Sequence, residues 1–277
     1  MVPPTANQRR ALADFLKARR ARLCPADVGL PAGPVRRAPG LRREEVAVLA
    51  GVSVTWYTWL EQGRRINPSE SVLRAIARTL CLRPDETAHL LELAGPAPVI
   101  EPAEPSPALQ DLVDSQHAAP AFIIDRRWDL IAWNAAADAV WNYSAVPVGE
   151  RNLAWLTFHP IIRARLVDWA GHARRVVAEV RAGSAALSDD RRFAEVLAEL
   201  RARHPEVDDW WSAGDVRTRT GVRKVYDHPD AGRLHLDEVI LRPAGAPDLQ
   251  LVVLVPVRDT GTADRLAALA TPAEARR

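Results

Sequence analysis

Residues 43–62 read REEVAVLAGVSVTWYTWLEQ, and this stretch decides the fold of the front third of the chain. It predicts a helix that ends near Gly51, a short turn, and a second helix from Ser53 to Gln62. Glycine ends a helix in the left-handed conformation without steric cost, and a serine hydroxyl caps the next helix by accepting a backbone N–H. Small Ala47 lets the two helices approach closely. The apolar positions that give both helices a shared buried face are Val46, Ala50, Val52, Tyr57 and Leu60. The pattern therefore favours a helix-turn-helix over an ordinary helical hairpin.

Helical signals continue on both sides of this motif. The ranges with apolar residues at helical spacing are 7–23, 71–81 and 84–94. Before the second of these ranges, Asn67 is a candidate N-cap, Pro68 suits the first helical position, and Glu70 completes a capping box. Residues 1–95 are therefore predicted to form an all-α head of five helices.

The run from Val46 to Leu80 resembles the Xre/Cro-type helix-turn-helix family, and the likeness extends over residues 7–95. It implies that the helix from Ser53 to Gln62 enters the major groove of double-stranded DNA. The residues that we expect to face base edges are Ser53, Val54, Thr55, Thr58 and Trp59. The residues that we expect to meet phosphates are Arg36, Arg37, Arg42, Arg43, Gln62, Arg64 and Arg65.

The chain departs from simpler family members in two respects. A long loop from Cys24 to Gly40 separates the first two helices. In addition, Val54 and Trp59 stand where polar residues are common. Thr55 can hydrogen bond to a base or touch a thymine methyl group, whereas Trp59 could face DNA, the core or a dimer partner.

Formal charge is distributed unevenly along the chain. Residues 1–95 hold 15 basic and 9 acidic residues, a net charge of +6, whereas the remainder holds 22 and 26, a net charge of −4. Neutralisation of phosphates supplies much of the affinity of proteins for DNA. The basic front half is therefore the half expected to bind DNA, although many single arginines there are ordinary surface residues.

Length and composition limit the remaining possibilities. A chain of 277 residues can hold two domains, and its two cysteines, Cys24 and Cys81, are too few for a disulfide framework or a cysteine metal site. No apolar run reaches membrane-spanning length and the N-terminus carries no signal segment, so we expect a cytoplasmic protein without membrane contact. Arginine greatly outnumbers lysine, which occurs only at positions 17 and 224 and suggests a bacterial genome of high GC content.

A second domain follows a proline-rich segment. Five of the residues from 95 to 107 are proline, so residues 96–107 are predicted to be an extended linker. The predicted strands span 121–124, 128–133, 222–226, 234–241 and 249–257. The predicted helices span 135–141, opened by Asn134, then 160–183, and a further segment capped by Ser188. This order predicts an α+β domain over residues 108–258 with helices on one face of a sheet, followed by a C-terminal tail over residues 259–277.

The stretch from Phe122 to Ala136 resembles the opening of a PAS-type sensor domain. The segments 152–155 and 160–169, with the pair Trp210-Trp211, are similar to the MmyB-like ligand-binding domain, which accompanies an Xre-type head in actinobacterial transcription regulators. The likeness spans roughly residues 107–257. It implies a small hydrophobic ligand, such as a fatty acid or a related acyl chain.

The residues themselves support a ligand site less directly. Seven of the nine tryptophans lie in this second domain, and aromatic side chains line apolar pockets as well as ordinary cores. The residues predicted to line the pocket are Trp133, Trp141, Phe158, Arg163, Trp169, Val239 and Leu241. Arg163 or Arg165 could pair with an acidic head group, or could simply be solvated.

Catalysis is not predicted. The seven histidines form no His-x-x-x-His pair, and the chain has no CxxC, P-loop or nucleophile elbow. The favoured interpretation is a ligand-responsive transcription regulator without a cofactor, a repressor that acts as a homodimer on DNA. The alternatives are a second domain used only for dimerisation or partner binding, and a purely architectural DNA-binding protein.

Overall fold

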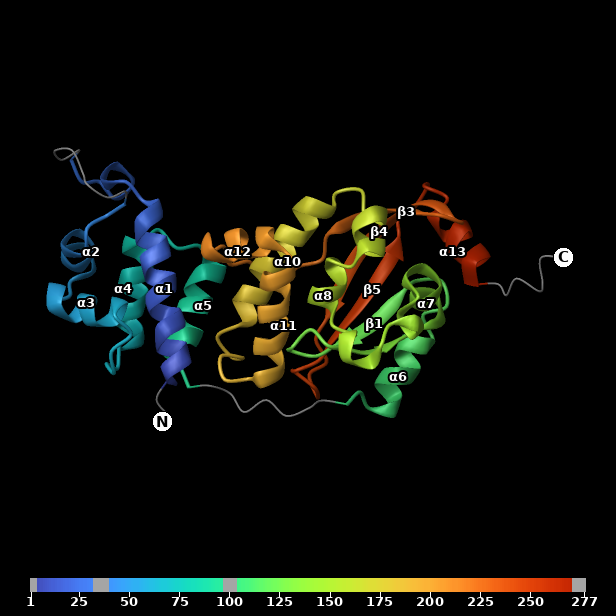
Figure 1. Cartoon of the computed structure of the whole chain (residues 1–277), viewed down its shortest axis with the longest axis horizontal. Coiled ribbons are helices and arrows are strands. Elements are labelled where there is room, and N and C mark those ends of the chain that lie inside the picture. The colour runs from blue at the N-terminus through green and yellow to red at the C-terminus, as the bar shows by residue number, and fades with distance from the viewer. Residues whose placement is uncertain (1–3, 32–39, 97–103, 271–277) are drawn as a thin grey trace. The chain divides into compact units, whose positions relative to one another are not determined.

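The computed structural model describes residues 4–31, 40–96 and 104–270 of the chain (Figure 1). The chain divides into two compact units. The first, which we call the helical unit, comprises residues 1–99 and 177–218. The second, the sheet unit, comprises residues 100–176 and 219–277. Each unit is described separately.

The helical unit contains the predicted helix-turn-helix. Its N-terminal helices are α1 (Ala6–Arg22), the short 3-10 helix η1 (Pro25–Val28), α2 (Arg43–Ala50), α3 (Val54–Glu61), α4 (Glu70–Thr79) and α5 (Pro84–Ala94). Gly51 ends α2 with a φ of 69°, and the Ser53 side chain caps α3 by accepting a hydrogen bond from the Trp56 amide. Phe15, Leu16 and Tyr57 are among the largest side chains in an apolar core that the helices share. The five-helix head is therefore confirmed.

The helical unit also includes residues far along the chain. It takes in the C-terminal part of α10 (Trp169–Gly183), α11 (Arg191–Arg203) and α12 (Pro205–Ser212). Ala185 and Val216 are fully buried in the same apolar core as Phe15 and Leu16. The predicted second domain, residues 108–258, includes this segment, and no local pattern indicates that its residues pack against the N-terminal helices.

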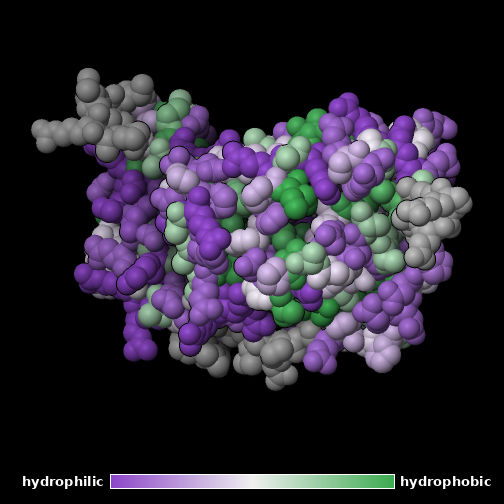
Figure 2. Space-filling view, turned by 45° about the vertical axis from the view of Figure 1, so that its right-hand side comes forward, coloured by the Kyte–Doolittle hydropathy of each residue, from purple (hydrophilic) through white to green (hydrophobic). Residues whose placement is uncertain are grey.

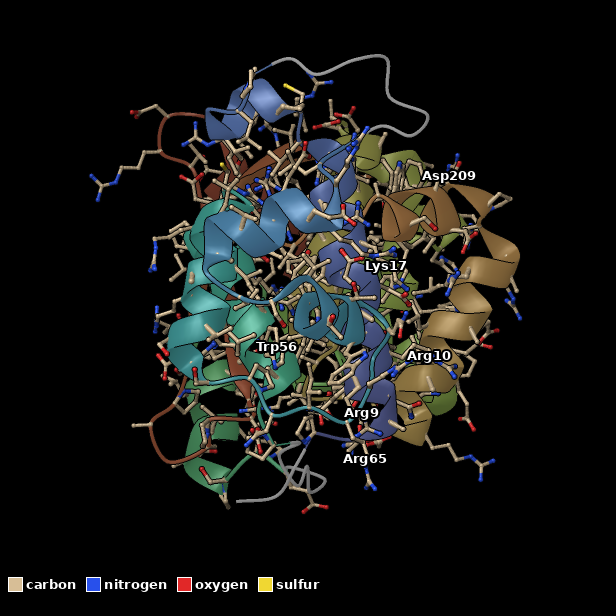
Figure 3. All side chains as sticks on the ribbon, turned by 90° about the vertical axis from the view of Figure 1, so that its left-hand side faces the viewer. Arg9, Arg10, Lys17, Trp56, Arg65 and Asp209 are labelled. Carbon is tan, nitrogen blue, oxygen red and sulfur yellow. The ribbon has the colours of Figure 1, made fainter. Side chains whose placement is uncertain are left out.

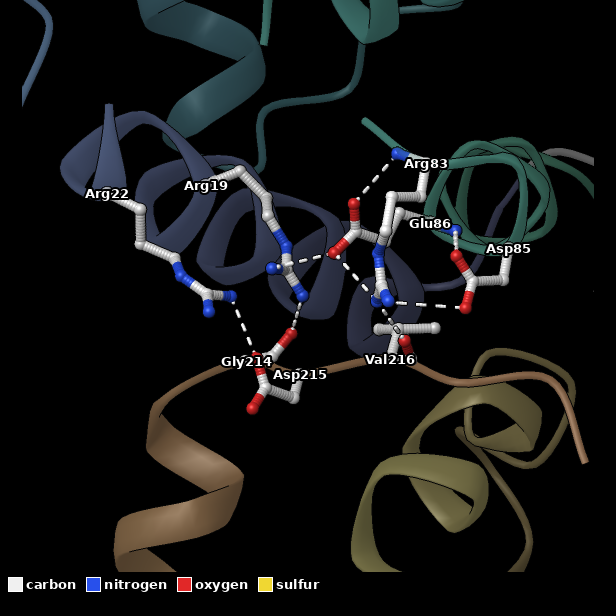
Figure 4. A network of polar contacts seen from close by, with 8 residues as sticks. All are labelled: Arg19, Arg22, Arg83, Asp85, Glu86, Gly214, Asp215 and Val216. Carbon is white, nitrogen blue, oxygen red and sulfur yellow. Dashed lines mark hydrogen bonds and ion pairs between the residues drawn. The ribbon is translucent and has the colours of Figure 1, made fainter. Parts of the chain in front are cut away.

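A buried polar network joins the distant segment to α1 and α5 (Figure 4). Arg19 Nη1 lies 2.9 Å from Glu86 Oε1, and both side chains are almost fully buried. The Arg19 guanidinium also donates to the Gly214 carbonyl oxygen, and Arg83 donates to the Val216 carbonyl oxygen at 2.8 Å. Buried carbonyl groups need such partners, so the network fixes where the chain passes across the head.

The sheet unit holds one antiparallel sheet in the order β2-β1-β5-β4-β3. The strands are β1 (Ala121–Ile124), β2 (Leu130–Trp133), β3 (Arg223–His228), β4 (Gly232–Leu241) and β5 (Gln250–Pro256). The other elements are α6 (Pro107–Asp114), α7 (Ala135–Trp141), η2 (Tyr143–Ala145), η3 (Val148–Glu150), α8 (Leu153–Thr157), α9 (Pro160–Arg165) and α13 (Thr262–Ala270). All five predicted strands are present, and the α+β class is confirmed.

The two faces of this sheet are used differently. Register and alternation place Phe122, Trp133 and Glu238 on one face, where the Phe122 ring meets Trp141 of α7. The opposite face carries Ile123, which forms a small core with α6. Helices therefore cover both faces, whereas the sequence predicted one.

Several predicted boundaries were wrong for local reasons. The predicted helix 160–183 is two helices, because Leu166 leaves the helix to form a β-bridge with Tyr226. Asp190, not Ser188, caps α11, because its side chain accepts a hydrogen bond from the Phe193 amide. Ser69, not Asn67, caps α4. The predicted tail contains α13, which packs against α7 and β4.

Candidate DNA interface and ligand site

The helix α3 has one buried and one open side. Tyr57, Leu60 and Glu61 point into the core. The five residues predicted to face bases share the other side, where Thr58 is half-buried and the remaining four, Ser53, Val54, Thr55 and Trp59, are exposed. Trp59 keeps 39 % of its surface exposed, so it is not a core residue. Its ring is instead 5.6 Å from the Arg64 guanidinium, a cation–π distance.

Six of the seven predicted phosphate-binding residues fall into three groups. Arg42 at the start of α2, Gln62 at the end of α3 and Arg65 shortly after it are exposed. Arg64 is exposed as well but stacks on Trp59. Arg36 and Arg37 lie outside the described residues. In the space-filling view the visible surface of the N-terminal helices, at the left, is mostly hydrophilic (Figure 2).

Arg43 differs from the other predicted phosphate-binding residues. Its Nε lies 2.7 Å from Glu61 Oε2, so its guanidinium holds α2 against α3. Arg20 of α1 binds the same carboxylate through Nε at 2.6 Å and through Nη2 at 3.1 Å. Burial would raise the pKa of Glu61, but hydrogen bonds from Arg20 and Arg43 outweigh it and hold the pKa below its usual value. Arg43 therefore has a structural role that the sequence did not reveal.

A cavity of about 680 Å³ lies beside the start of α4. Arg9 of α1 and Arg65 line it, together with the chain from Ile66 to Glu70 and the end of α5. Figure 3 shows Arg9, Arg10 and Arg65 grouped on the face of the head that presents α3. The sequence predicts a phosphate contact for Arg65, whereas Arg9 counts there only toward the positive charge of residues 1–95.

The sheet unit contains a smaller cavity of about 210 Å³. It lies among η2, α8 and α9. Its wall is mainly apolar and aromatic, with the residues Trp141, Asn142, Tyr143, Ala145, Val146, Pro147, Glu150, Leu156, His159, Ile161 and Ile162. Apolar walls with a few polar groups are typical of small-molecule sites.

The structure does not bring all the predicted pocket residues together. Trp141 lines the cavity, and Trp133 stands 6.0 Å from the ring of Tyr143. Phe158 and Trp169 form a separate pair at 5.7 Å, and the exposed Arg163 stacks on Trp169 at 4.0 Å.

Val239 and Leu241 are the clearest correction to the predicted pocket. The strand register places both on the face of the sheet opposite Trp133, and both are exposed. Alternation along β4 therefore separates them from the cavity.

A second group of side chains in the sheet unit was missed. Lys224 of β3 and Glu238 of β4 are buried and lie 2.9 Å apart, and Arg219 Nη2 is 3.2 Å from the same Glu238 oxygen. The sequence held one sign that Lys224 has a special role. Lys224 is one of only two lysines in a chain rich in arginine, and it lies in a strand pattern.

Within residues 4–31, 40–96 and 104–270, no cluster of three or more His, Cys, Asp or Glu side chains could hold a metal ion. In these same ranges no helix combines the length and apolar character that crossing a membrane requires. Cys24 and Cys81 are both exposed free thiols.

Comparison with known families gives two matches. A helix-turn-helix domain matches residues 11–90, which include α2 and α3. The MmyB-like transcription regulator ligand binding domain matches residues 105–269, more than half of the chain. A comparison with curated proteins finds no match. The chain therefore belongs to the family of transcription regulators with an MmyB-like ligand-binding domain, here behind an N-terminal helix-turn-helix.

Proposed function

We propose that this regulator is a cytoplasmic repressor that binds DNA as a homodimer and responds to a small hydrophobic acid, such as a fatty acid. The observation that carries the proposal is the pairing of an open α3 face with an apolar cavity in the matched ligand-binding domain. The sheet would serve as a PAS-type sensor. Two copies of α3 would lie about 34 Å apart on a roughly palindromic site.

The cavity supports an apolar ligand. Leu156, Ile161 and Ile162 form part of its wall together with the Trp141 and Tyr143 rings, which stack at 5.5 Å. Burying an alkyl chain against such side chains contributes about 0.8 kcal/mol per methylene group. An acyl chain is therefore the ligand class that this wall favours.

Native mass spectrometry of the purified chain tests the sensor role. An added mass that denaturation releases, and that corresponds to an acyl compound, would support it. Addition of that compound should then change the affinity of the full chain for its selected operator. A ligand that leaves operator affinity and reporter expression unchanged would contradict the proposed response.

A second function of the sheet unit is favoured by one surface. Val239, Leu241 and Val255 are 41 %, 50 % and 41 % exposed. They lie on one face of neighbouring strands β4 and β5. This face could serve dimerisation without any ligand. In that case Val239→Asp should produce monomers, and no small molecule should co-purify.

The first prediction concerns base readout. Thr55 is exposed on the open face of α3. Thr55→Ala should change the preferred base at one operator position, with a loss of about 1–3 kcal/mol at most for the native base. Selection from a randomised DNA library measures this change. If the variant and the wild type prefer the same bases, Thr55 does not contribute to base recognition.

The second prediction concerns phosphate contact. Arg65 is exposed and lines the cavity beside α4. Arg65→Ala should weaken binding to all sequences alike and make the dependence of log K on log salt shallower by about one unit. Arg191 is a matched control, since it is exposed on α11 and not on the α3 face. A salt slope unchanged by Arg65→Ala would contradict the assignment.

A further inference from the structure

The open face of α3 carries no formal charge. Val54, Thr55 and Trp59 are exposed on it, and Thr58 is half-buried. Side chains three and four positions apart adjoin on a helix, so these four form one continuous strip. Glu61 is the only charged residue of α3, and it is fully buried. A valine, two threonines and a tryptophan are therefore what this helix presents to a partner.

This composition limits how α3 can recognise a base pair. Bidentate hydrogen bonds from arginine to guanine, or from asparagine and glutamine to adenine, need groups that the strip does not have. Ser53 uses its hydroxyl oxygen to cap the helix. Gln62 carries an amide, but it lies at the C-terminal end of α3, whereas the N-terminal residues of a recognition helix contact base edges. The apolar group that a base pair presents in the major groove is the 5-methyl group of thymine.

The surroundings of the strip favour DNA over an apolar protein partner. The Arg64 guanidinium lies 5.6 Å from the centre of the Trp59 ring, so a positive charge adjoins the strip directly. Arg42 and Arg65 on the flanking segments are exposed, and residues 1–95 carry a net charge of +6. A major groove places methyl groups on its floor between two rows of phosphates. An apolar strip beside exposed cations is complementary to both features.

We propose that α3 recognises its operator through the 5-methyl groups of pyrimidines, which Val54 and Thr55 contact while Trp59 excludes water beside them. This inference rests on the proposed binding of DNA and names the chemistry of its base readout. Removing one methyl group from water contributes about fourfold in affinity. The contact does not require thymine as such, because 5-methylcytosine presents the same group at the same position of the ring.

Replacement of single thymines by deoxyuridine tests this readout on the full chain and its selected operator. Uracil lacks only the 5-methyl group, so its hydrogen bonds to adenine are retained. Fluorescence anisotropy should show a loss of about fourfold in affinity at one or more positions. At such a position a pair of guanine with 5-methylcytosine should bind about fourfold more tightly than guanine with cytosine.

Val54→Ala separates a direct contact from a structural role. Val54 is 38 % exposed and alanine favours a helix, so the variant should fold. It should reduce the preference for thymine over uracil from about fourfold towards none at one position and leave the other positions unchanged. A structural role would instead weaken the two operators equally. Val148→Ala is the matched control, because Val148 is a valine of the sheet unit with 77 % exposure.

The outcomes separate this inference from the function on which it rests. Equal affinity for thymine and uracil at every position would overturn the methyl readout and leave DNA binding standing, as would a selected operator in which no position requires thymine. An unchanged preference in Val54→Ala would overturn the contact of Val54. A wild type that selects no DNA sequence would overturn both the readout and the proposed regulator function.

Discussion

Glu61→Gln is expected to lower the free energy of unfolding of the helical unit by about 3–5 kcal/mol. Glu61 is fully buried and accepts hydrogen bonds from Arg20 on α1 and Arg43 on α2. Glutamine keeps the shape of the side chain but loses its charge. Two guanidinium groups then lack their counter-charge, and one of them, Arg20, is mostly buried. Because Glu61 belongs to α3, specific DNA binding should be lost in parallel.

Urea unfolding followed by circular dichroism measures this loss, and Glu70→Gln is its control. Glu70 lies in the same head and pairs with Arg74 one turn away, but both side chains are more than half exposed. Exposed pairs of this kind contribute at most about 0.5 kcal/mol. If Glu61→Gln and Glu70→Gln unfolded at the same urea concentration, the Glu61 network would not be the element that joins the three helices.

Acidification from pH 7 to pH 5 is expected to cost the helical unit about 2 kcal/mol through His89 alone. This side chain of α5 is buried, lies edge-on to Phe15, and has its Nδ1 3.0 Å from the Ala182 carbonyl oxygen. Burial lowers the pKa of His89 from 6.5 to about 4; the bond to Ala182 opposes this shift, whereas the charges of Arg181 and Arg19 add to it.

Acidification destabilises the folded chain because the unfolded chain binds a proton at His89 more readily. Below pH 6.5 the unfolded chain protonates His89 while the folded chain does not. The stability is therefore complete above pH 6.5 and is lost as the pH falls towards 4. The full loss is about 3 kcal/mol, at roughly 1.4 kcal/mol for each pKa unit.

His89→Gln isolates this contribution because glutamine stays neutral and can still donate to Ala182. The difference in unfolding free energy between the wild type and His89→Gln should shift by about 2 kcal/mol between pH 7 and pH 5. His117 is exposed, so His117→Gln serves as the control. A difference that does not vary with pH would show that His89 is not held neutral by its surroundings.

Local sequence patterns predicted helix ends well where a single residue type strongly favours one backbone conformation or one capping hydrogen bond. Gly51 and Ser53 mark the turn before α3, and Asn134 caps α7, as their residue types indicated. The five strands were recognisable because apolar residues with high β propensity were bounded by turn residues. These signals act over a few positions, but neighbouring candidates can compete, as Ser69 did with Asn67 and Asp190 with Ser188.

Pairings between distant positions could not be predicted in the same way. Arg20 and Glu61 are 41 positions apart, and Arg19 and Gly214 are 195 apart. Nothing near either residue indicates its partner. Val239 and Leu241 were placed in the pocket because hydrophobicity was used without the register, although alternation puts them on the other face. The exposed side of α3 was predictable, but the buried ion pair of Lys224 and Glu238 depends on the pairing of β3 with β4.

The helical unit consists of two stretches of chain, residues 1–99 and 177–218, so the ribosome synthesises its two parts at different times. A ribosome releases the helix-turn-helix long before it releases Ala185 and Val216, which complete its core. Contacts between distant segments also form late, because the intervening loop must first close. Part of the apolar surface of the nascent N-terminal helices therefore stays exposed to solvent until residues 177–218 are synthesised and pack against it. DNA-binding competence should then emerge only after residue 218 has left the exit tunnel.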